Sequence, residues 1–546
     1  MYKRQEWGID SSGVIYESNG KTPGGMQFHT LSMIALARRG ENLWGHPHVR
    51  KLLEGQVLMT SPNGKVVVNS GTQYVPFSQQ YFSLQTVNEY KAFYPNNLCA
   101  DYLLSQPTVF GDKKNEADRE WIFDNFTPEK YSNEVSILKN LRMPSPMYPG
   151  FVHGFLYDTD FKLTTREELK LPLDFSAPIH GVFSSYSDES KDATWINMMV
   201  RPDHYLGAGH HHADAGMFHF AALGVNWITE SPFPQEYAGK YHNQVLVDGN
   251  SEPEGISGSG TGYQAAATYL GEMSSNLGAF ATSDLTNSYS YRWQTQPSPD
   301  WGEKLGYLNW ELDSSSQNLK NFAGTSRYKM RPWWATYTYS NYMATSKSLF
   351  NKMEYVYRSV GLVRGKHTYG IVIDNLKKDD QTHSYQWTAM LNGGVWEANI
   401  KGLPNNQIVL AYGNYDEKNT TKKSLISPTK GDPLLLVCYV NSDFVNTSGL
   451  PLMQVSTESG PTASHIARTN YYDRLAINIK SVVANYHVLM IPYKFGEDMP
   501  TISTVGDKTY LVWKDGQKDI LQFTTDATHR TKVVINRNGK AVVKSK

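Results

Sequence analysis

The densest group of side chains that could do chemistry lies in residues 207–220, which read Gly-Ala-Gly-His-His-His-Ala-Asp-Ala-Gly-Met-Phe-His-Phe. If this segment enters a β-strand, the two-residue alternation of side chains places His210, His212 and Asp214 on one face and His211 on the other. The pattern then predicts that three side chains of the metal-ligating type converge.

Two further segments downstream supply the same kinds of groups. Gly224-Val-Asn-Trp-Ile-Thr-Glu230 ends in a carboxylate, and the stretch from Tyr241 to Asp248 begins with His242 and Asn243. Imidazole, carboxylate and an amide or second imidazole form a reasonable ligand set for Zn²⁺ or Mn²⁺. The same groups also fit a hydrogen-bonded polar cluster without metal, and the spacing matches no short zinc motif.

Length and charge exclude several classes of protein. The chain has 546 residues, and its 52 Lys and Arg balance its 52 Asp and Glu. A length of this order predicts two to four domains, and a net charge of zero argues against nucleic acid as a partner. Aromatic residues make up 13% of the chain, which suits sugar rings as ligands but also ordinary packing. Oligomeric state is not indicated.

Neither the cysteines nor the N-terminal residues of this sequence indicate a cellular compartment. Cys99 and Cys438 lie too far apart to define a disulfide framework. No apolar run approaches the roughly 20 residues of a membrane span, and no apolar signal segment follows Met1. Because the pattern from Trp7 onward is typical of the middle of a domain, we expect that a preceding region, with any signal peptide, is missing.

Patterning along the chain predicts an α+β protein with several domains. Residues 26–39, 48–60 and 115–126 have the apolar spacing or composition of helices. From about Phe175 the texture changes to short alternating strands separated by turn residues, which favours antiparallel sheets stacked as a sandwich. The strands expected are 181–186, 195–200, 369–374 and 434–440, with a small terminal sheet at 509–513, 519–523 and 531–536.

These motifs together resemble the heparinase II/III superfamily of polysaccharide lyases. The specific part is His-x-His-x-Asp-x-Gly-x-Phe from His210, then Ile228-Thr-Glu230, then His-Asn before an apolar strand. Gly13-Val-Ile-Tyr-Glu17 and Gly45-His-Pro47 are similar to the last part of that family's (α/α) toroid. The resemblance implies the C-terminal part of an incomplete toroid at 1–172, a β-sandwich at 173–400, and its continuation with a small β-sheet at 401–546.

The resemblance also implies the ligands of a divalent metal. Ile228-Thr-Glu230 is closest to the epimerase-like branch of the superfamily, in which His, Glu and Asn hold the metal, here His212, Glu230 and Asn243. The lyase branch instead uses the histidine of the His-Asn pair, here His242, with an aspartate near Thr229. Thr229 departs from that second pattern.

An anionic polysaccharide containing uronic acid is the substrate that the resemblance implies. In such polymers a base removes the C5 proton while the carboxylate is neutralised and the C4 oxygen leaves. His210 takes the role of the active-site histidine by resemblance. The position expected for the toroid tyrosine holds Lys21, so the alternatives are Lys21 itself, the nearby Tyr16, and two tyrosines from the sandwich side, Tyr237 and Tyr241.

A last aromatic segment, Arg331-Pro-Trp-Trp334, is a candidate for substrate binding. Trp333 and Trp334 could stack on sugar rings beside the Arg331 cation, although packing within the sandwich explains the same residues. The expected activity is β-elimination by a periplasmic or secreted lyase. A uronate C5-epimerase, which shares the first proton transfer, and a carbohydrate-binding protein that has lost catalysis remain the alternatives.

Overall fold

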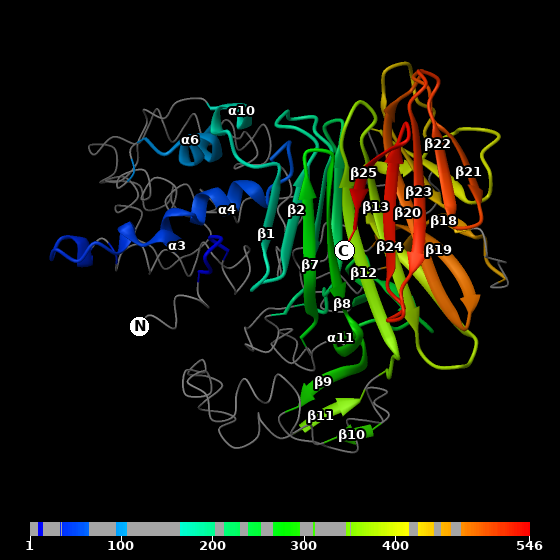
Figure 1. Ribbon diagram of the computed structural model, residues 1–546, viewed down its shortest axis with the longest axis horizontal. Helices are drawn as coiled ribbons and strands as arrows, with labels where there is room; N and C mark the ends of the chain where they lie inside the picture. The colour runs from blue at the N-terminus through cyan, green and yellow to red at the C-terminus, as the bar shows by residue number, and fades with distance from the viewer. Residues whose placement is uncertain are drawn as a thin grey trace.

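A computed structural model gives the arrangement of the chain (Figure 1). The residues whose placement it describes are 9–14, 33, 35–64, 94, 96–105, 164–202, 212–229, 239–252, 266–294, 309–311, 346–349, 351–413, 424–441, 449–459 and 471–545. Every ladder between named strands in these residues is antiparallel. The prediction that antiparallel sheets make up the C-terminal part of the chain is therefore confirmed.

Short helices precede the sheets and form a separate layer beside them (Figure 1). They are η1 (Leu43–Gly45), α3 (Pro47–Arg50), α4 (Leu52–Leu58), α6 (Leu98–Ser105) and α10 (Arg166–Leu169). The helical prediction for 48–60 is confirmed, whereas 115–126 and most of 26–39 lie outside the described residues. No helix in the described part of the chain is long and apolar enough to cross a membrane.

The first sheet of the sandwich contains the segments singled out above. Its strand order is β1-β2-β3-β4-β5-β14-β19-β18, and β6 pairs with β14 off this path. The strands are β1 (Asp174–Ala177), β2 (Val182–Tyr186), β3 (Trp195–Met199), β4 (Met217–Ala222), β5 (Val225–Thr229), β6 (Val245–Val247), β14 (His383–Leu391), β18 (Met453–Ser459) and β19 (Tyr471–Ser481).

The second sheet has the order β15-β16-β17-β20-β13-β12-β8-β7. Its strands are β7 (Thr268–Ser275), β8 (Gly278–Asp284), β12 (Tyr355–Val363), β13 (Tyr369–Lys377), β15 (Val395–Glu397), β16 (Gln407–Tyr412), β17 (Pro433–Tyr439) and β20 (Val483–Lys494). The strands expected at 181–186, 195–200, 369–374 and 434–440 therefore exist in β2, β3, β13 and β17.

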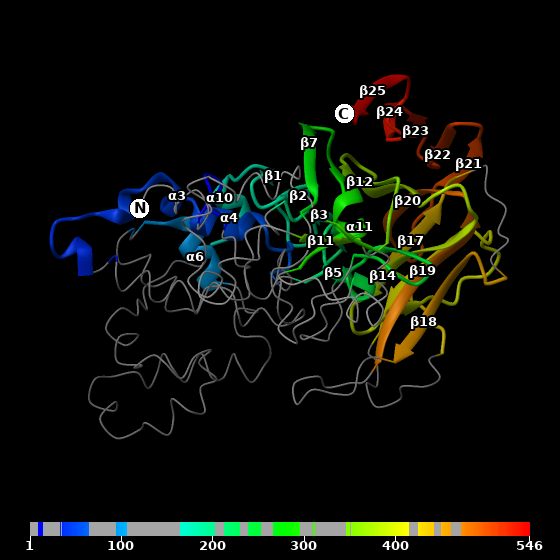
Figure 2. The ribbon, with the colours of Figure 1, turned by 90° about the horizontal axis from the view of Figure 1, so that it is seen from below.

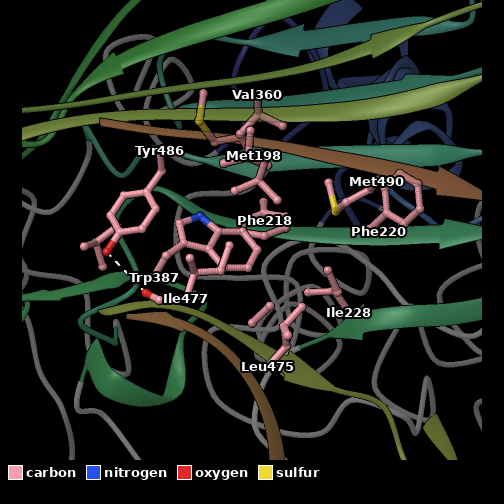
Figure 3. Close-up of a cluster of buried hydrophobic side chains, with 14 of the residues drawn as sticks. Met198, Phe218, Phe220, Ile228, Val360, Trp387, Leu475, Ile477, Tyr486 and Met490 are labelled. Atoms are coloured by element: carbon pink, nitrogen blue, oxygen red, sulfur yellow. Dashed lines mark hydrogen bonds between the residues drawn. The ribbon is translucent and has the colours of Figure 1, made fainter. Parts of the chain in front are cut away.

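The two sheets bury a common core (Figure 3). Phe218 and Trp387 of the first sheet lie 5.6 Å apart between ring centroids, and both are fully buried with Val360 of the second sheet. Tyr486 of β20 reaches across to donate its hydroxyl to the carbonyl of Ile477 in β19, at 3.3 Å. Because β4, β5 and β14 all contribute to this core, the loops that leave them start from fixed positions.

Two smaller sheets complete the described structure. One joins β9 (Tyr291–Gln294), β10 (Asn309–Glu311) and β11 (Ser346–Leu349), which follow the short helix α11 (Thr286–Ser290). The other is a five-stranded meander that lies along the outside of the sandwich (Figure 2). Its strands are β21 (Thr501–Val505), β22 (Lys508–Val512), β23 (Lys518–Thr525), β24 (Thr531–Arg537) and β25 (Lys540–Lys544), so the predicted terminal sheet is confirmed.

The helical layer is attached to the first sheet through the end of α4. Tyr186 of β2 is fully buried, and its hydroxyl lies 2.9 Å from the carbonyl oxygen of Leu58 and 2.5 Å from that of Thr60. The Arg166 guanidinium stacks 3.7 Å from the centre of the Tyr186 ring. A cation and a hydroxyl thus meet the carbonyls at the negative end of the helix, which is the favourable arrangement.

Candidate functional site

The candidate site lies where the hairpin β4–β5 meets the short loop before β6. A 3₁₀ turn, η5 (Gly239–Tyr241), precedes His242, Asn243 and Gln244, and the chain then enters β6. A Cβ at Gly239 would lie 2.1 Å from the Ser251 hydroxyl oxygen and 2.3 Å from the Gln244 side-chain oxygen, so both side chains would have to move. The glycine thus allows the turn to lie close against the loop that carries His242.

Two of the predicted metal ligands are brought together at this point. The rings of His212 and His242 lie 5.0 Å apart between centroids, tilted by 59°. Both side chains are buried, with exposed fractions of 3% and 2%. Residues separated by thirty positions in the sequence therefore present two imidazoles to one another, as the proposed ligand set requires.

Asn243 fastens this loop to three strands of the first sheet. Its side-chain nitrogen donates to the carbonyls of Phe218 in β4, at 2.7 Å, and Thr229 in β5, at 2.8 Å. Its side-chain oxygen accepts the backbone N–H of Met390 in β14 at 2.6 Å. Both N–H groups and one lone pair of the oxygen are used, which favours a structural role for Asn243 over that of a metal ligand.

Arg358 holds the same loop from the second sheet. Its guanidinium forms a two-pronged pair with Asp374, at 2.6 and 3.1 Å, and donates to the carbonyls of Gly216, at 2.7 Å, and Asn243, at 2.6 Å. Arg358 and Asp374 are direct cross-strand partners in β12 and β13. The start of β4 and the histidine loop are thereby tied to one buried cation.

Within the described residues Asp214 and His212 lie before the strand begins, so the prediction that strand alternation places these two on one face is wrong. The segment 212–216 is irregular and β4 begins only at Met217. The Asp214 carboxylate instead forms a fully buried, two-pronged pair with Arg201, at 2.7 and 2.6 Å. The physical reason is that a buried carboxylate needs a partner cation, and Arg201 supplies one with matching geometry.

Buried polar groups next to the loop complete its support. Glu252 accepts the backbone N–H of Ala215 at 2.8 Å, and the Gln244 amide donates to the Ala215 carbonyl at 2.8 Å. The Tyr289 hydroxyl meets the backbone of Val245 at the start of β6, at 3.1 Å from its oxygen. Burial raises the pKa of Tyr289, so this hydroxyl keeps its proton at neutral pH.

Tyr241 is the one candidate for the catalytic tyrosine that lies within the described residues. Its ring packs edge-on against Tyr472, at 5.3 Å and 76°, in a small cluster with Met390. The side chain is 4% exposed, and the Lys240 ammonium lies 5.0 Å from the ring centre. Tyr241 therefore lies beside His242 but with its ring built into the packing.

The other predicted site residues lie outside the described residues. They are His210, Lys21, Tyr16, Tyr237 and Glu230, together with the aromatic segment Arg331, Trp333 and Trp334. Within the described part of the chain, no group of three or more His, Cys, Asp or Glu side chains is placed to hold a metal ion. Glu230 follows directly on Thr229, whose carbonyl Asn243 binds.

Comparison with solved structures identifies the architecture. The crystal structure of the heparan sulfate lyase HepC from Pedobacter heparinus matches with a TM-score of 0.51 and 11% identity, over 99% of this chain. A crystal structure of heparinase III matches with a TM-score of 0.50 and 10% identity, over 98% of this chain. The chain has the heparinase III fold. The resemblance inferred from the histidine-rich motif is thus confirmed at the level of fold.

The heparinase III likeness has limits that bear on function. This chain spans 60% of the length of the heparinase structures named above. No family model matches the sequence, and no curated protein matches it. At this identity the likeness shows the fold, and activity must be argued from the site.

Arg358, Asp374, Gln244 and Glu252 support the site but were not predicted as part of it. A signal for the first two was present, because an arginine and an aspartate each occur in a strand of mostly apolar and aromatic residues. In a hairpin of that spacing they are opposite one another, as the register of β12 and β13 shows. Gln244 and Glu252 carry no comparable sequence signal.

Proposed function

We propose that this protein is a polysaccharide lyase that cleaves an anionic polysaccharide at uronic acid residues by β-elimination. The observation that carries the proposal is the buried pair His212 and His242 on a heparinase III fold. We further propose that the helical part belongs to an (α/α) toroid extending over residues 1–172 and that the protein is periplasmic or secreted. The substrate would lie between toroid and sandwich.

The proposed reaction needs three functions from the side chains. A base takes the C5 proton of the uronate, cationic or hydrogen-bonding groups neutralise its carboxylate, and an acid returns a proton to the C4 oxygen that leaves. His210, two residues before His212 in the sequence, is our candidate to contact the uronate. For the base we keep Lys21, Tyr16 and Tyr237 as candidates, whereas Tyr241 would have to leave its contact with Tyr472.

A divalent metal, Zn²⁺ or Mn²⁺, belongs to the proposal. The two imidazoles of His212 and His242 fit such an ion, because they are adjacent and buried. Asn243 fits less well, because its amide binds three backbone groups. We therefore propose His212, His242 and Glu230 as the ligands. A bound cation would supply positive charge for the uronate carboxylate.

The first test is the ultraviolet absorbance of the unsaturated uronate that β-elimination produces. The purified protein is assayed against heparan sulfate, alginate, glucuronan and ulvan, with and without a chelator. We expect a rise in absorbance on one polymer, its loss in His210→Ala and His242→Ala, and its retention in His529→Ala, which removes an exposed histidine from the terminal sheet. A variant His210→Ala that stays active would remove that residue from the mechanism.

Metal content is measured separately from activity. We expect the wild-type protein to retain close to one equivalent of Zn²⁺ or Mn²⁺ after dialysis, and Glu230→Ala and His212→Ala to retain much less. Equal metal content in wild type and both variants would contradict the ligand assignment while leaving the lyase proposal standing.

A uronate C5-epimerase is the second candidate, favoured by the motif Ile228-Thr-Glu230. It shares the first proton transfer and then returns a proton to the opposite face of C5. Incubation in deuterated water separates the candidates, because an epimerase incorporates deuterium at C5 without forming unsaturated ends. Binding of the polymer without unsaturated ends and without deuterium at C5 would indicate the third candidate, a carbohydrate-binding protein without catalysis. The reason to consider this candidate is that Lys21 stands where the family has a tyrosine.

A further inference from the structure

The five-stranded terminal sheet is a rigid layer fixed to the sandwich. Its inner face buries Leu511, Leu521 and Val533 against the second sheet. Arg537 forms a two-pronged pair with the buried Asp519, at 2.8 and 2.7 Å, and Asp519 also accepts the hydroxyl of Tyr369 at 2.9 Å. A face built on such a layer keeps its side chains in fixed positions.

The opposite face of this sheet looks outward from the molecule (Figure 2). Alternation along the strands turns Lys508, Tyr510 and Val512 of β22 to this side, because Thr509 and Leu511 are buried on the other. Val512 is 39% exposed, and Val505 at the end of β21 is 68% exposed. We call this the outer face; it consists of the outward residues of β21 to β25.

The strand register arranges the outer face in rows. One row runs Val505, Lys508, Gln522, Val534 and Lys544 across the five strands. Strands spaced about 4.8 Å apart separate the two lysines by about 14 Å. A neighbouring row contains Tyr510 and Ile520, and the Lys518 ammonium lies 5.2 Å from the Tyr510 ring centre.

The outer face carries positive charge in a chain whose net charge is zero. Asp519 is the only acidic residue in the five strands β21 to β25, and it points inward. The turn residue Asp507 borders the face, and its carboxylate accepts the Gln522 side-chain amide at 2.8 Å. Lys508, Lys518, Lys532 and Lys544 occupy outward positions, and Lys532 lies 3.4 Å from the turn residue Asp526. Three lysines therefore surround a strip of aromatic and aliphatic side chains. Cations around a planar ring suit a linear anionic polymer of sugar rings.

We infer that the outer face binds an anionic polysaccharide at a second place, apart from the proposed histidine site, through Lys508, Lys518, Lys544 and the ring of Tyr510. The choice of a polysaccharide rests on the proposed function, whereas the charge and register of the face do not. The lysines contact carboxylate or sulfate groups, and Tyr510 stacks on a sugar ring. This second contact would hold the polymer while the proposed site acts on another part of the same polymer.

The test measures binding of immobilised long-chain heparan sulfate and alginate by the full chain, without requiring turnover. We expect K508S/K518S/K544S to raise the Kd about fivefold. Each exposed ion pair changes the Kd by about 1.7-fold, and the factors for three such pairs multiply. The control K191S/K352S/K401S removes the same charge from three exposed lysines elsewhere and should change the Kd less than twofold. Lysine to arginine changes at the three tested positions should preserve binding, and Tyr510→Ala should weaken it.

The outcomes separate this inference from the proposed function. An equal loss in the test and control variants would show an effect of net charge alone and would overturn the inference. Tighter binding of single-stranded DNA of equal charge than of either polysaccharide would overturn the choice of ligand. If no unsaturated ends form but the test variant alone loses binding, the inference about the outer face is supported and the lyase proposal is contradicted. Unchanged thermal unfolding of the triple variants verifies that the sheet is intact.

Discussion

Replacing Asn243 by aspartate separates a structural role for this residue from a role as metal ligand. In Asn243→Asp the side-chain oxygen that accepts the Met390 N–H is kept, and so is tolerance of the left-handed backbone at φ 53°. Two N–H donors are lost, and the carbonyls of Phe218 and Thr229 then face a carboxylate instead of an amide.

The magnitude follows from those two carbonyls. Each buried polar group left without a partner costs about 1–3 kcal/mol, so the loss of both predicts a decrease of about 2–6 kcal/mol in the free energy of unfolding. Burial of a new charge adds to the loss unless the carboxylate takes up a proton. A metal ligand would respond in the opposite way, because a carboxylate in place of an amide adds charge that attracts a divalent cation.

The assay combines hydrogen exchange of β4, β5 and β14 with titration of Zn²⁺ and Mn²⁺ into the metal-free protein. We expect Asn243→Asp to lose exchange protection at the ends of these strands and to gain no metal affinity. The exposed Asn250 offers a matched control, and Asn250→Asp should stay within about 0.5 kcal/mol of wild type. Unchanged protection together with tighter metal binding in Asn243→Asp would refute the structural interpretation.

Three further predictions concern stability. Burial lowers the pKa of His487 from 6.5 to about 4, so its contribution to the free energy of unfolding is present above pH 6.5 and is lost as the pH falls toward 4. At pH 5 the loss is about 2 kcal/mol. Hydrogen exchange of β22 to β24, compared between wild type and His487→Leu, will measure it. Tyr186→Phe should cost about 1–3 kcal/mol and increase exchange in α4, because the hydroxyl that meets its last carbonyls is lost. Gly239→Ala should lower the melting temperature and increase exchange around Gln244, since the added methyl meets that side chain at 2.3 Å; equal melting would contradict the packing argument.

The terminal meander could be predicted from the sequence because its buried and exposed side chains alternate with a period of two. Val182–Tyr186 and Trp195–Met199 are buried at every position, and they could be predicted because each is a short run of strand-forming residues between turns. The helical prediction at 48–60 rested in the same way on local spacing, and α3 and α4 confirm it. The local pattern is enough to predict a helix or strand when tertiary contacts do not change which of its residues are buried.

Long-range polar contacts could not be predicted from such patterns. No pattern within 207–220 shows that Asp214 pairs with Arg201. This ion pair, and not the alternation of a strand, determines where the Asp214 side chain lies. Arg364 is only 4% exposed and donates to the carbonyls of Tyr186 and Ser275, which lie far from it in the sequence. The partner that decides each role is chosen by the tertiary fold, which local spacing does not encode.

The pairing of the buried carboxylates limits what a metal at the histidine pair can use. Asp214 and Asp374 are each held by a guanidinium, and drawing either one away would leave a buried arginine without its partner, at a cost of about 3–5 kcal/mol. The Asn243 amide is committed to the backbone of β4, β5 and β14. The third buried carboxylate beside the loop, Glu252, accepts the backbone N–H of Ala215. We therefore propose that a cation between His212 and His242 would take its carboxylate from Glu230, which follows Thr229 in the sequence.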